Sequence, residues 1–149
     1  MKNILVIGTG RSSSVLIEYL LNYSQSNNYY VTVLDQFEND FLRLFQTFSN
    51  FKSLIFDINN EKLRHKEVKK SELIISMLPA RFHTKIAKDC LFYKKNLITA
   101  SYVSEEMNSF NKDAIKQDIL MLNEIGLDPG IDHLSAMSII DSLKSKNYD

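Results

Sequence analysis

A glycine-rich hexapeptide, GTGRSS at positions 8–13, separates an apolar run from a helical pattern. It matches the G-x-G-x-x-G dinucleotide fingerprint, except that Ser13 holds the place of the third glycine. Backbone N–H groups at the start of the following helix would favour a bound phosphate. The alternative is a tight turn that needs glycine without any ligand. The residues expected to hold the dinucleotide phosphates are Gly8, Gly10, Arg11, Ser12 and Ser13.

Two acidic residues end the next apolar runs. Asp35 is placed to accept hydrogen bonds from an adenosine ribose, and a carboxylate there would repel a 2′-phosphate. Arg11 favours NADP instead, because its cation would attract that phosphate. We expect NAD or NADP, with NAD slightly preferred. Asp57 and Ile58 are expected near the adenine, and the alternative for Asp57 is a turn residue before the next helix.

A second group of polar residues follows two later apolar runs. Ser101 ends the run at 96–101 and Tyr102 follows it, and Asp128 lies in the segment NEIGLDPGIDH at 123–133. Hydroxyl and carboxylate groups can bind a polar substrate and exchange protons with it. Glu124 is expected to shape this loop. The three histidines and one cysteine lack the spacing of metal ligands, so no metal is expected.

These residues need a scaffold that brings them together. Apolar runs that alternate with helical patterns predict parallel strands joined by right-handed crossovers. The expected fold is therefore a doubly wound α/β sheet of the Rossmann type, with strand order 3-2-1-4-5-6 and a ligand crevice at the carboxyl ends of the strands. The six predicted strands are 3–8, 30–35, 53–58, 72–79, 96–101 and 119–125.

Helical patterns fill the intervals between the strands. An apolar stripe at Phe41, Leu44, Phe45 and Phe48 predicts one helix. Others are expected over 80–95, from a cap at Ser104 to about Gln117, and from near Ile131. The last pattern is apolar on two faces, which normally means burial on both sides, with one face on the sheet. We expect residues 1–130 to form the dinucleotide-binding domain. Residues 131–149 would begin a helix that leads to a missing C-terminal substrate and dimerisation domain, so a fragment of a longer protein is expected.

Bulk composition narrows the classes of function. The chain has 149 residues, of which 44% are hydrophobic and 24% charged, as expected for one globular domain. A formal net charge of zero argues against nucleic acid or anionic membrane as a partner. The single cysteine excludes an internal disulfide bond and fits a reducing cytoplasm.

Three segments together resemble one enzyme family. They are VIGTGR at 6–11, ISMLPARFHTKIAKDCLFYKKNLITASYVSEEM at 75–107 and NEIGLDPGIDHLSAM at 123–137. The resemblance is to the glutamate-forming saccharopine dehydrogenases, or saccharopine reductases, and it runs over the whole chain. It implies an N-terminal Rossmann domain followed by a larger substrate domain. The implied reaction is the NAD(P)-dependent oxidation of saccharopine to glutamate and aminoadipate semialdehyde, or the reverse, in lysine metabolism.

The resemblance also implies residue roles. Ser101 and Tyr102 would contact saccharopine, Asp128 would lie at the substrate and nicotinamide end, and Tyr102 and Asp128 are the expected catalytic pair. Most arginines that bind the substrate carboxylates would come from the missing domain, so the chain alone is expected not to be fully active. The residues implied to line the cofactor are Ser76, Met77, Leu78, Ile98, Thr99, Leu127, Gly130 and Ile131.

Other readings stay open at this point. A carboxynorspermidine dehydrogenase would share the architecture, although the intact GLDPGIDH at 126–133 favours saccharopine. A non-catalytic nucleotide-sensing Rossmann domain would explain the glycine loop but not the second polar group. An enzyme truncated by a frameshift is a third reading, and a homodimer is a further expectation.

Overall fold

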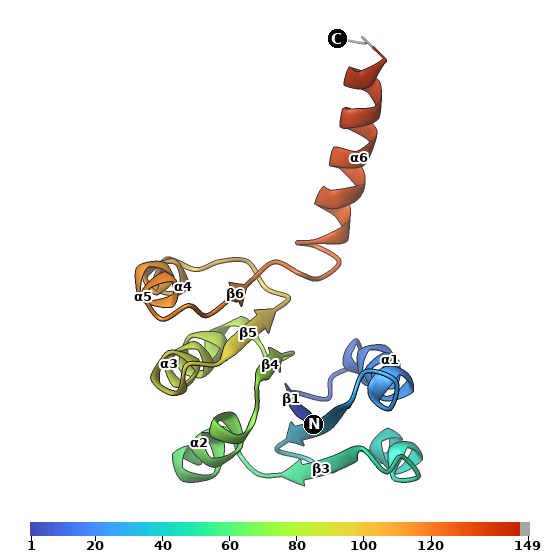
Figure 1. The fold of residues 1–149 in the computed structure, drawn as a ribbon, viewed down its shortest axis with the longest axis vertical. Helices are drawn as coiled ribbons and strands as arrows, with labels where there is room; N and C mark the ends of the chain where they lie inside the picture. Colours follow the sequence, from blue (N-terminus) through green and yellow to red (C-terminus); the bar gives the residue numbers. More distant parts are fainter. Residues whose placement is uncertain (147–149) are drawn as a thin grey trace.

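The sheet has the predicted order. In the computed structural model, which describes residues 1–146, six parallel strands lie in the order β3-β2-β1-β4-β5-β6 (Figure 1). The sixth strand is much shorter than the apolar run at 119–125 that predicted it. The strands are β1 (Lys2–Ile7), β2 (Tyr29–Asp35), β3 (Phe51–Ile55), β4 (Leu73–Ser76), β5 (Asn96–Thr99) and β6 (Met121–Leu122).

The helices differ from the predicted ones in two places. The aromatic stripe from Phe41 to Phe48 forms a 3₁₀ helix followed by a turn, and the helix expected from Ser104 to Gln117 is split at Phe110. Ser104 is the predicted cap, and its hydroxyl accepts the Met107 N–H at 3.1 Å. The helices are α1 (Ser13–Ser24), η1 (Asp40–Phe45), α2 (Glu61–Lys70), η2 (Ala80–Phe82), α3 (His83–Tyr93), α4 (Glu105–Ser109), α5 (Asn111–Lys116) and α6 (Ile131–Ser145).

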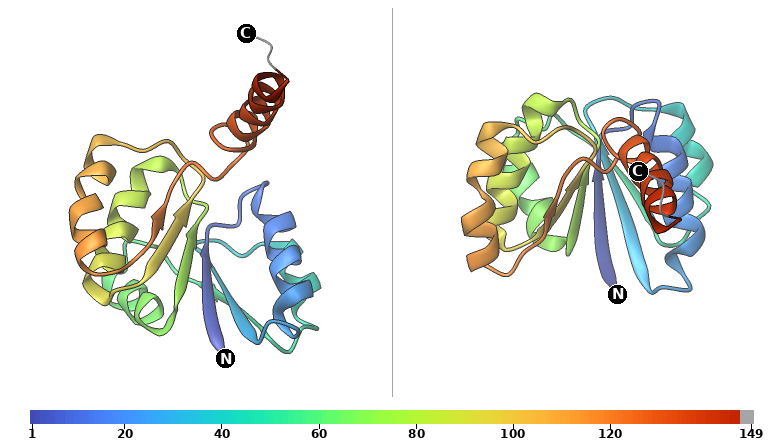
Figure 2. Two further views of the ribbon diagram at one scale, coloured as in Figure 1. Left: turned by 45° about the horizontal axis from the view of Figure 1, so that its top comes forward. Right: turned by 90° about the horizontal axis from the view of Figure 1, so that it is seen from above.

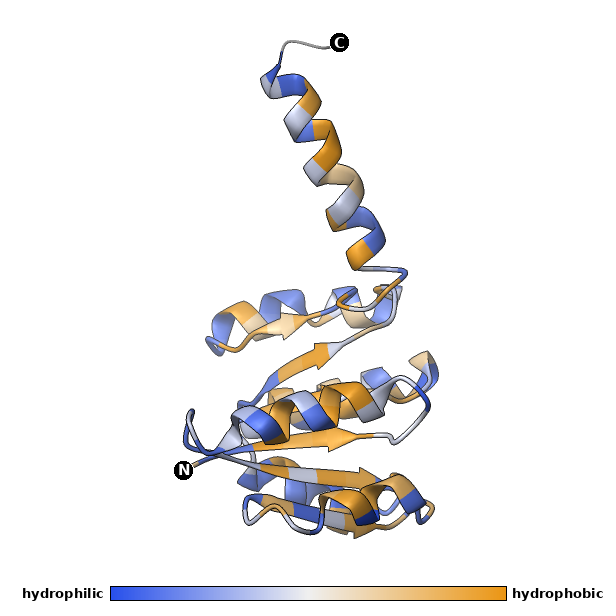
Figure 3. Ribbon diagram, turned by 90° about the vertical axis from the view of Figure 1, so that its right-hand side faces the viewer, coloured by the Kyte–Doolittle hydropathy of each residue, from blue (hydrophilic) through white to orange (hydrophobic). Residues whose placement is uncertain are grey.

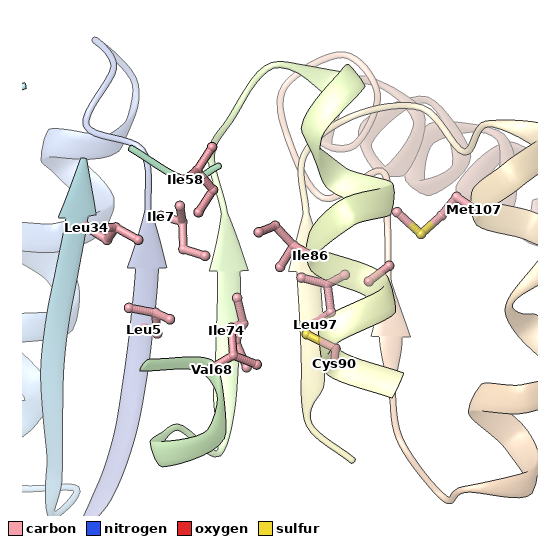
Figure 4. Packing of buried hydrophobic residues seen from close by; sticks show 11 residues of the cluster. Leu5, Ile7, Leu34, Ile58, Val68, Ile74, Ile86, Cys90, Leu97 and Met107 are labelled. Atoms are coloured by element: carbon pink, nitrogen blue, oxygen red, sulfur yellow. The ribbon is translucent and has the colours of Figure 1, made fainter. Parts of the chain in front are cut away.

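Each face of the sheet carries its own core. Successive side chains of a strand point to opposite faces, so Leu5 and Ile7 lie on one face and Val6 on the other. Helices α2, α3 and α4 cover the first face, where Ile74 and Ile86 are fully buried (Figure 4). Helices α1 and η1 cover the second face (Figure 2). The topology reverses between β1 and β4, which places the expected crevice at the carboxyl ends of these two strands.

A buried ion pair joins α2 to α3. Arg64 Nε lies 2.5 Å from Asp89 Oδ2, and both side chains are only 7% exposed. The remaining groups are also satisfied, since Arg64 Nη1 donates to the Ile58 carbonyl at 2.7 Å and His65 Nε2 lies 2.9 Å from Asp89 Oδ1. Full pairing offsets the cost of removing these charges from water. The cluster therefore fixes the packing of α2 against α3 beneath the loop that carries Ile58.

Helix α6 corrects one prediction. It begins at Ile131 as expected, but within the described residues none of its side chains is buried, so neither apolar face packs on the sheet. The loop before it turns the chain outward, and Gly130 has a φ of 149°. The helix then projects from the body with apolar and polar residues exposed on all sides (Figures 1 and 3). The division into domains at residue 130 stays a prediction, and residues 147–149 of the second range lie outside the described part.

No helix among residues 1–146 combines the length and the apolar character needed to span a lipid bilayer.

Candidate functional site

The two glycines of the loop are explained by different physical requirements. Gly8 has a φ of 101°, and a Cβ atom there would lie 3.0 Å from the carbonyl carbon and oxygen of Met77. Folding alone therefore requires glycine at position 8. A Cβ atom at Gly10 would meet no atom within 4 Å. Packing within the chain does not explain Gly10, whereas the close approach of a ligand to its backbone would.

Ser13 replaces the third glycine of the fingerprint without loosening the fold. Its side chain is fully buried at the start of α1, and its hydroxyl donates to the Gly10 carbonyl at 2.6 Å. The serine therefore packs against the sheet and braces the turn. Arg11 and Ser12 are exposed beside it.

Asp35 holds the glycine loop in place. Its Oδ2 accepts hydrogen bonds from the Thr9 N–H and the Thr9 hydroxyl, each at 2.6 Å. Its Oδ1 accepts the N–H groups of Gln36 at 2.6 Å and Phe37 at 3.1 Å. Burial acts to raise the pKa of the Asp35 carboxyl, but these hydrogen bonds outweigh it and hold the pKa below its ordinary value. The carboxylate therefore stays ionised and organises the loop, and its contact with a ribose stays a prediction.

A cavity of about 570 Å³ opens at the carboxyl ends of β1, β2 and β4. Its volume is in the range of ordinary ligand sites. The predicted cofactor residues in its wall are Gly8, Gly10, Asp35, Asp57, Ile58, Met77 and Leu78. The wall does not include the predicted residues Arg11, Ser12, Ser13, Ser76, Ile98, Thr99, Leu127, Gly130 and Ile131. The cavity therefore contains the residues predicted for the glycine loop and for the adenosine end of the cofactor, and their contact with a dinucleotide stays a prediction.

Asp57 forms a turn before α2 and also lines the cavity. Its Oδ1 accepts the Asn59 N–H at 2.8 Å, which makes the expected turn, while the residue also lines the cavity. The helix cap itself is Asn60, whose side chain accepts the Leu63 N–H at 3.2 Å. Asp57 therefore forms the expected turn, and its position near an adenine stays a prediction.

The predicted catalytic pair is in direct contact. The Tyr102 hydroxyl donates to Asp128 Oδ1 at 2.5 Å, although the two residues are far apart in sequence. This hydrogen bond is the main reason that the pKa of Tyr102 is raised above its ordinary value. Tyr102 therefore remains a neutral phenol at physiological pH. Both side chains are exposed, Tyr102 in the loop after β5 and Asp128 in the loop after β6, and neither is in the cavity wall.

The loop at 123–131 is held by its own backbone. The Glu124 N–H donates to the Ser101 carbonyl at 3.2 Å, and Glu124 Oε1 accepts the Val103 N–H at 3.0 Å. Glu124 thus has the expected shaping role. Gly126 and Gly130 form a bridge so close that a Cβ atom at Gly130 would lie 2.1 Å from the Gly126 carbonyl oxygen. The tight loop presents Asp128 beside Tyr102.

The sequence reasoning gave no role to two residues that organise this site. Thr9 fills a variable place in the fingerprint, yet it makes both hydrogen bonds to Asp35 Oδ2. His83, the first residue of α3, lies 2.9 Å from the Ser76 hydroxyl through Nδ1 and 2.8 Å from the Ser101 hydroxyl through Nε2. The available signal was the position of His83 at the start of α3, in the connection that follows β4. Among residues 1–146, no group of three or more His, Cys, Asp or Glu side chains is arranged to hold a metal ion.

The family follows from the match of this region to known proteins. The family model described as "Saccharopine dehydrogenase NADP binding domain" matches residues 4–122. The chain belongs to the saccharopine dehydrogenase family. The resemblance given by the three sequence segments is therefore confirmed.

Individual members of the saccharopine dehydrogenase family cover almost the whole chain. "Alpha-aminoadipic semialdehyde synthase, mitochondrial" of Rattus norvegicus is 35% identical over 144 residues, which are 96% of this chain and 15% of that protein. The NADP(+), L-glutamate-forming saccharopine dehydrogenase of Schizosaccharomyces pombe is 32% identical over 143 residues, 96% of this chain and 31% of that protein. The chain thus spans less than a third of the length of these relatives.

A solved structure of the family has the same fold. The apo L-Glu-forming saccharopine dehydrogenase of Saccharomyces cerevisiae superimposes with a TM-score of 0.83 at 29% identity, over 97% of this chain and 32% of that one. The homoserine dehydrogenase of S. aureus, at 16% identity and a TM-score of 0.59, shares the fold alone.

Proposed function

We propose that the chain binds a nicotinamide dinucleotide in the cavity at the ends of β1, β2 and β4. The observation that carries this proposal is the contrast between the two loop glycines, since Gly10 is explained by space for a ligand and not by packing. The ionised Asp35 keeps the loop in its open shape through Thr9. The cofactor would run from Asp57, at the adenosine end, toward the mouths of β4 and β5.

The proposed reaction is the oxidation of saccharopine at its secondary amine, or the reverse reduction. A bound nicotinamide would supply the hydride acceptor for the carbon beside the amine nitrogen, and a base of the protein would take the proton of the nitrogen as the C=N bond forms. Water then adds to that carbon, and the C–N bond breaks to give glutamate and aminoadipate semialdehyde. The names of the relatives support this substrate, and the reaction belongs to the longer proteins that they describe.

Asp128 is the proposed base, and the Tyr102 hydroxyl would hold its carboxylate in position. Within the described residues, Asp128 Oδ2 receives no hydrogen bond, while Oδ1 is held by the Tyr102 hydroxyl. The free oxygen can accept the proton of the amine or of the attacking water, and Ser101 would contact a substrate carboxylate. The test is Tyr102→Phe in the chain saturated with NADH: saccharopine should bind several-fold more weakly while NADH affinity is unchanged. Loss of NADH affinity instead would place Tyr102 in the cofactor site.

We propose NAD(H) over NADP(H) as the cofactor. Two carboxylates, Asp35 and Asp57, line the cavity, and in the described part of the chain Arg81 is the one arginine or lysine in its wall. A 2′-phosphate beside these carboxylates would be repelled, and Arg11 lies outside the wall. The S. pombe relative is named for NADP(+), so this chain would differ from it.

Other features belong to the same proposal. The carboxylate-binding arginines of the substrate site would come from a further domain that the longer relatives have room for, and the exposed apolar faces of α6 would dock against that domain or a second copy. Turnover by these 149 residues alone should therefore be slow or absent.

We propose a cytoplasmic location, because the chain has a single cysteine and so fits a reducing compartment, whereas the rat relative is named mitochondrial. Cell fractionation would separate the two.

A further inference from the structure

A buried histidine links the cofactor side of the crevice to the substrate side. His83 is 4% exposed and bridges Ser76, the fully buried last residue of β4, to Ser101, which is half-buried and lies two residues after the end of β5. The two hydrogen bonds, at 2.9 and 2.8 Å, use both ring nitrogens. The direction of each bond depends on which nitrogen carries the hydrogen.

Counting hydrogens decides that direction. Burial lowers the pKa of His83 below its ordinary value, so the ring is neutral and has one donor and one acceptor. Among the described residues, His83 Nδ1 is the one hydrogen-bond partner of the Ser76 hydroxyl. If Nδ1 carried the hydrogen, the Ser76 hydroxyl hydrogen would be buried without an acceptor, which is strongly unfavourable. Ser76 therefore donates to Nδ1, and the ring hydrogen is on Nε2.

The consequence appears at Ser101. Because Nε2–H donates to the Ser101 oxygen, the hydroxyl hydrogen of Ser101 is not used in that bond, and among the described residues it has no other partner. We propose that His83 is a positioning residue that makes Ser101 a hydrogen-bond donor, directed at an anionic group of the substrate such as a carboxylate and not at an ammonium group. The identity of the substrate rests on the proposed function, whereas the tautomer of His83 does not.

The hydrogen-bonded chain Ser76–His83–Ser101, called the relay below, would also orient the substrate. Ser101, which donates, directly precedes Tyr102, which holds the proton acceptor Asp128. A substrate carboxylate at Ser101 would put the neighbouring amine within reach of Asp128. Ser101, after β5, would thus bind the negative carboxylate of the substrate, and Asp128, after β6, would bind its amine.

The first test reads the tautomer in the complete 149-residue chain without any ligand. Long-range ¹H–¹⁵N NMR correlations distinguish a ring protonated at Nε2 from one protonated at Nδ1, and the His83→Gln variant identifies the signals. We expect a neutral Nε2–H ring at pH 7.5. An Nδ1–H ring, or an imidazolium at that pH, would overturn the proposal.

The second test measures saccharopine affinity in the NADH-saturated chain. His83→Gln should keep the affinity within about threefold, because an amide can accept from Ser76 and donate to Ser101, whereas His83→Leu should lose about tenfold, the value of one charge-assisted hydrogen bond. NADH affinity should change in neither variant. Equal losses in both variants would contradict the relay. If saccharopine does not bind the unmodified chain while the ring is Nε2–H, the relay stands, and the proposal that these residues bind saccharopine without the further domain fails.

Discussion

Thr9 and Asp35 join the ends of two neighbouring strands through one carboxylate oxygen. Both the N–H and the hydroxyl of Thr9 donate to Asp35 Oδ2 at 2.6 Å. The acidic residue of the dinucleotide fingerprint therefore acts first on its own glycine loop. A carboxylate has about four acceptor positions, and the protein fills all of them with Thr9, Gln36 and Phe37. Any ribose hydroxyl has to share one of these positions.

Asp35→Asn should loosen the loop. An amide keeps only one acceptor oxygen, so either Thr9 or the N–H groups of Gln36 and Phe37 would face a nitrogen that cannot accept. We expect a loss of about 1.5–3 kcal/mol in the free energy of unfolding and weaker NADH binding. Urea denaturation and NADH titration measure the two effects. Asp57→Asn is the matched control, since its amide oxygen can still accept the Asn59 N–H. Equal stability of the two variants would show that Asp35 does not hold the loop.

Alanine at the two loop glycines should separate folding from binding. Gly8→Ala places a Cβ atom against the Met77 backbone at a φ of 101°, so the thermal midpoint should fall by several degrees. Gly10→Ala meets no protein atom, so the midpoint should hardly change while NADH affinity drops at least tenfold. Calorimetry of both variants provides the comparison. Unchanged NADH affinity in Gly10→Ala would remove the main support for the cavity as a dinucleotide site.

His83 should make the fold sensitive to mild acid. Its pKa is lowered in the folded chain, so the unfolded chain takes up this proton first as the pH falls. The stability that the neutral ring contributes is complete above its ordinary pKa of 6.5 and is lost as the pH falls from there through the folded-state pKa. Between pH 7.5 and 5.5, the free energy of unfolding should therefore fall more steeply in the unmodified chain than in His83→Gln. Parallel pH profiles would mean that His83 does not titrate as described.

The Arg64–Asp89 pair should dominate the stability of the α2–α3 layer. Asp89→Asn leaves the Arg64 guanidinium buried with an incomplete partner, so we expect a loss of about 3–5 kcal/mol in the free energy of unfolding. Glu106→Gln is the control, because its ion pair with Lys88 is exposed and should leave the urea midpoint unchanged. A similar small effect in both variants would show that the buried pair is dispensable.

The sequence predicted the sheet well because each strand is a separate apolar run. Its order followed from the fold type. The family resemblance pointed to Tyr102 and Asp128 separately, and the hydrogen bond between them was not predicted. The type of helix at the aromatic stripe near Phe41 was harder to predict, since the same spacing also suits a short 3₁₀ helix. Helix α6 was misjudged for another reason: two apolar faces tell what a helix can bury, but not that the sheet will cover one of them.

The organisation of the site was less accessible to sequence reasoning. The Ser76–His83–Ser101 relay depends on how the start of α3 meets the ends of β4 and β5, which no local pattern records. The full occupation of Asp35 likewise depends on the closure of the loop over β2, and the fingerprint specifies only an acidic residue at that point.

The most direct test is a calorimetric titration of the purified chain with NADH and with NADPH, with circular dichroism to establish that the chain is folded. We predict that NADH binds at micromolar strength and more tightly than NADPH, because Asp35 and Asp57 line the cavity. Tighter binding of NADPH would overturn the proposed cofactor preference. Binding of neither, in a folded chain, would contradict the central claim that these residues form a working dinucleotide site.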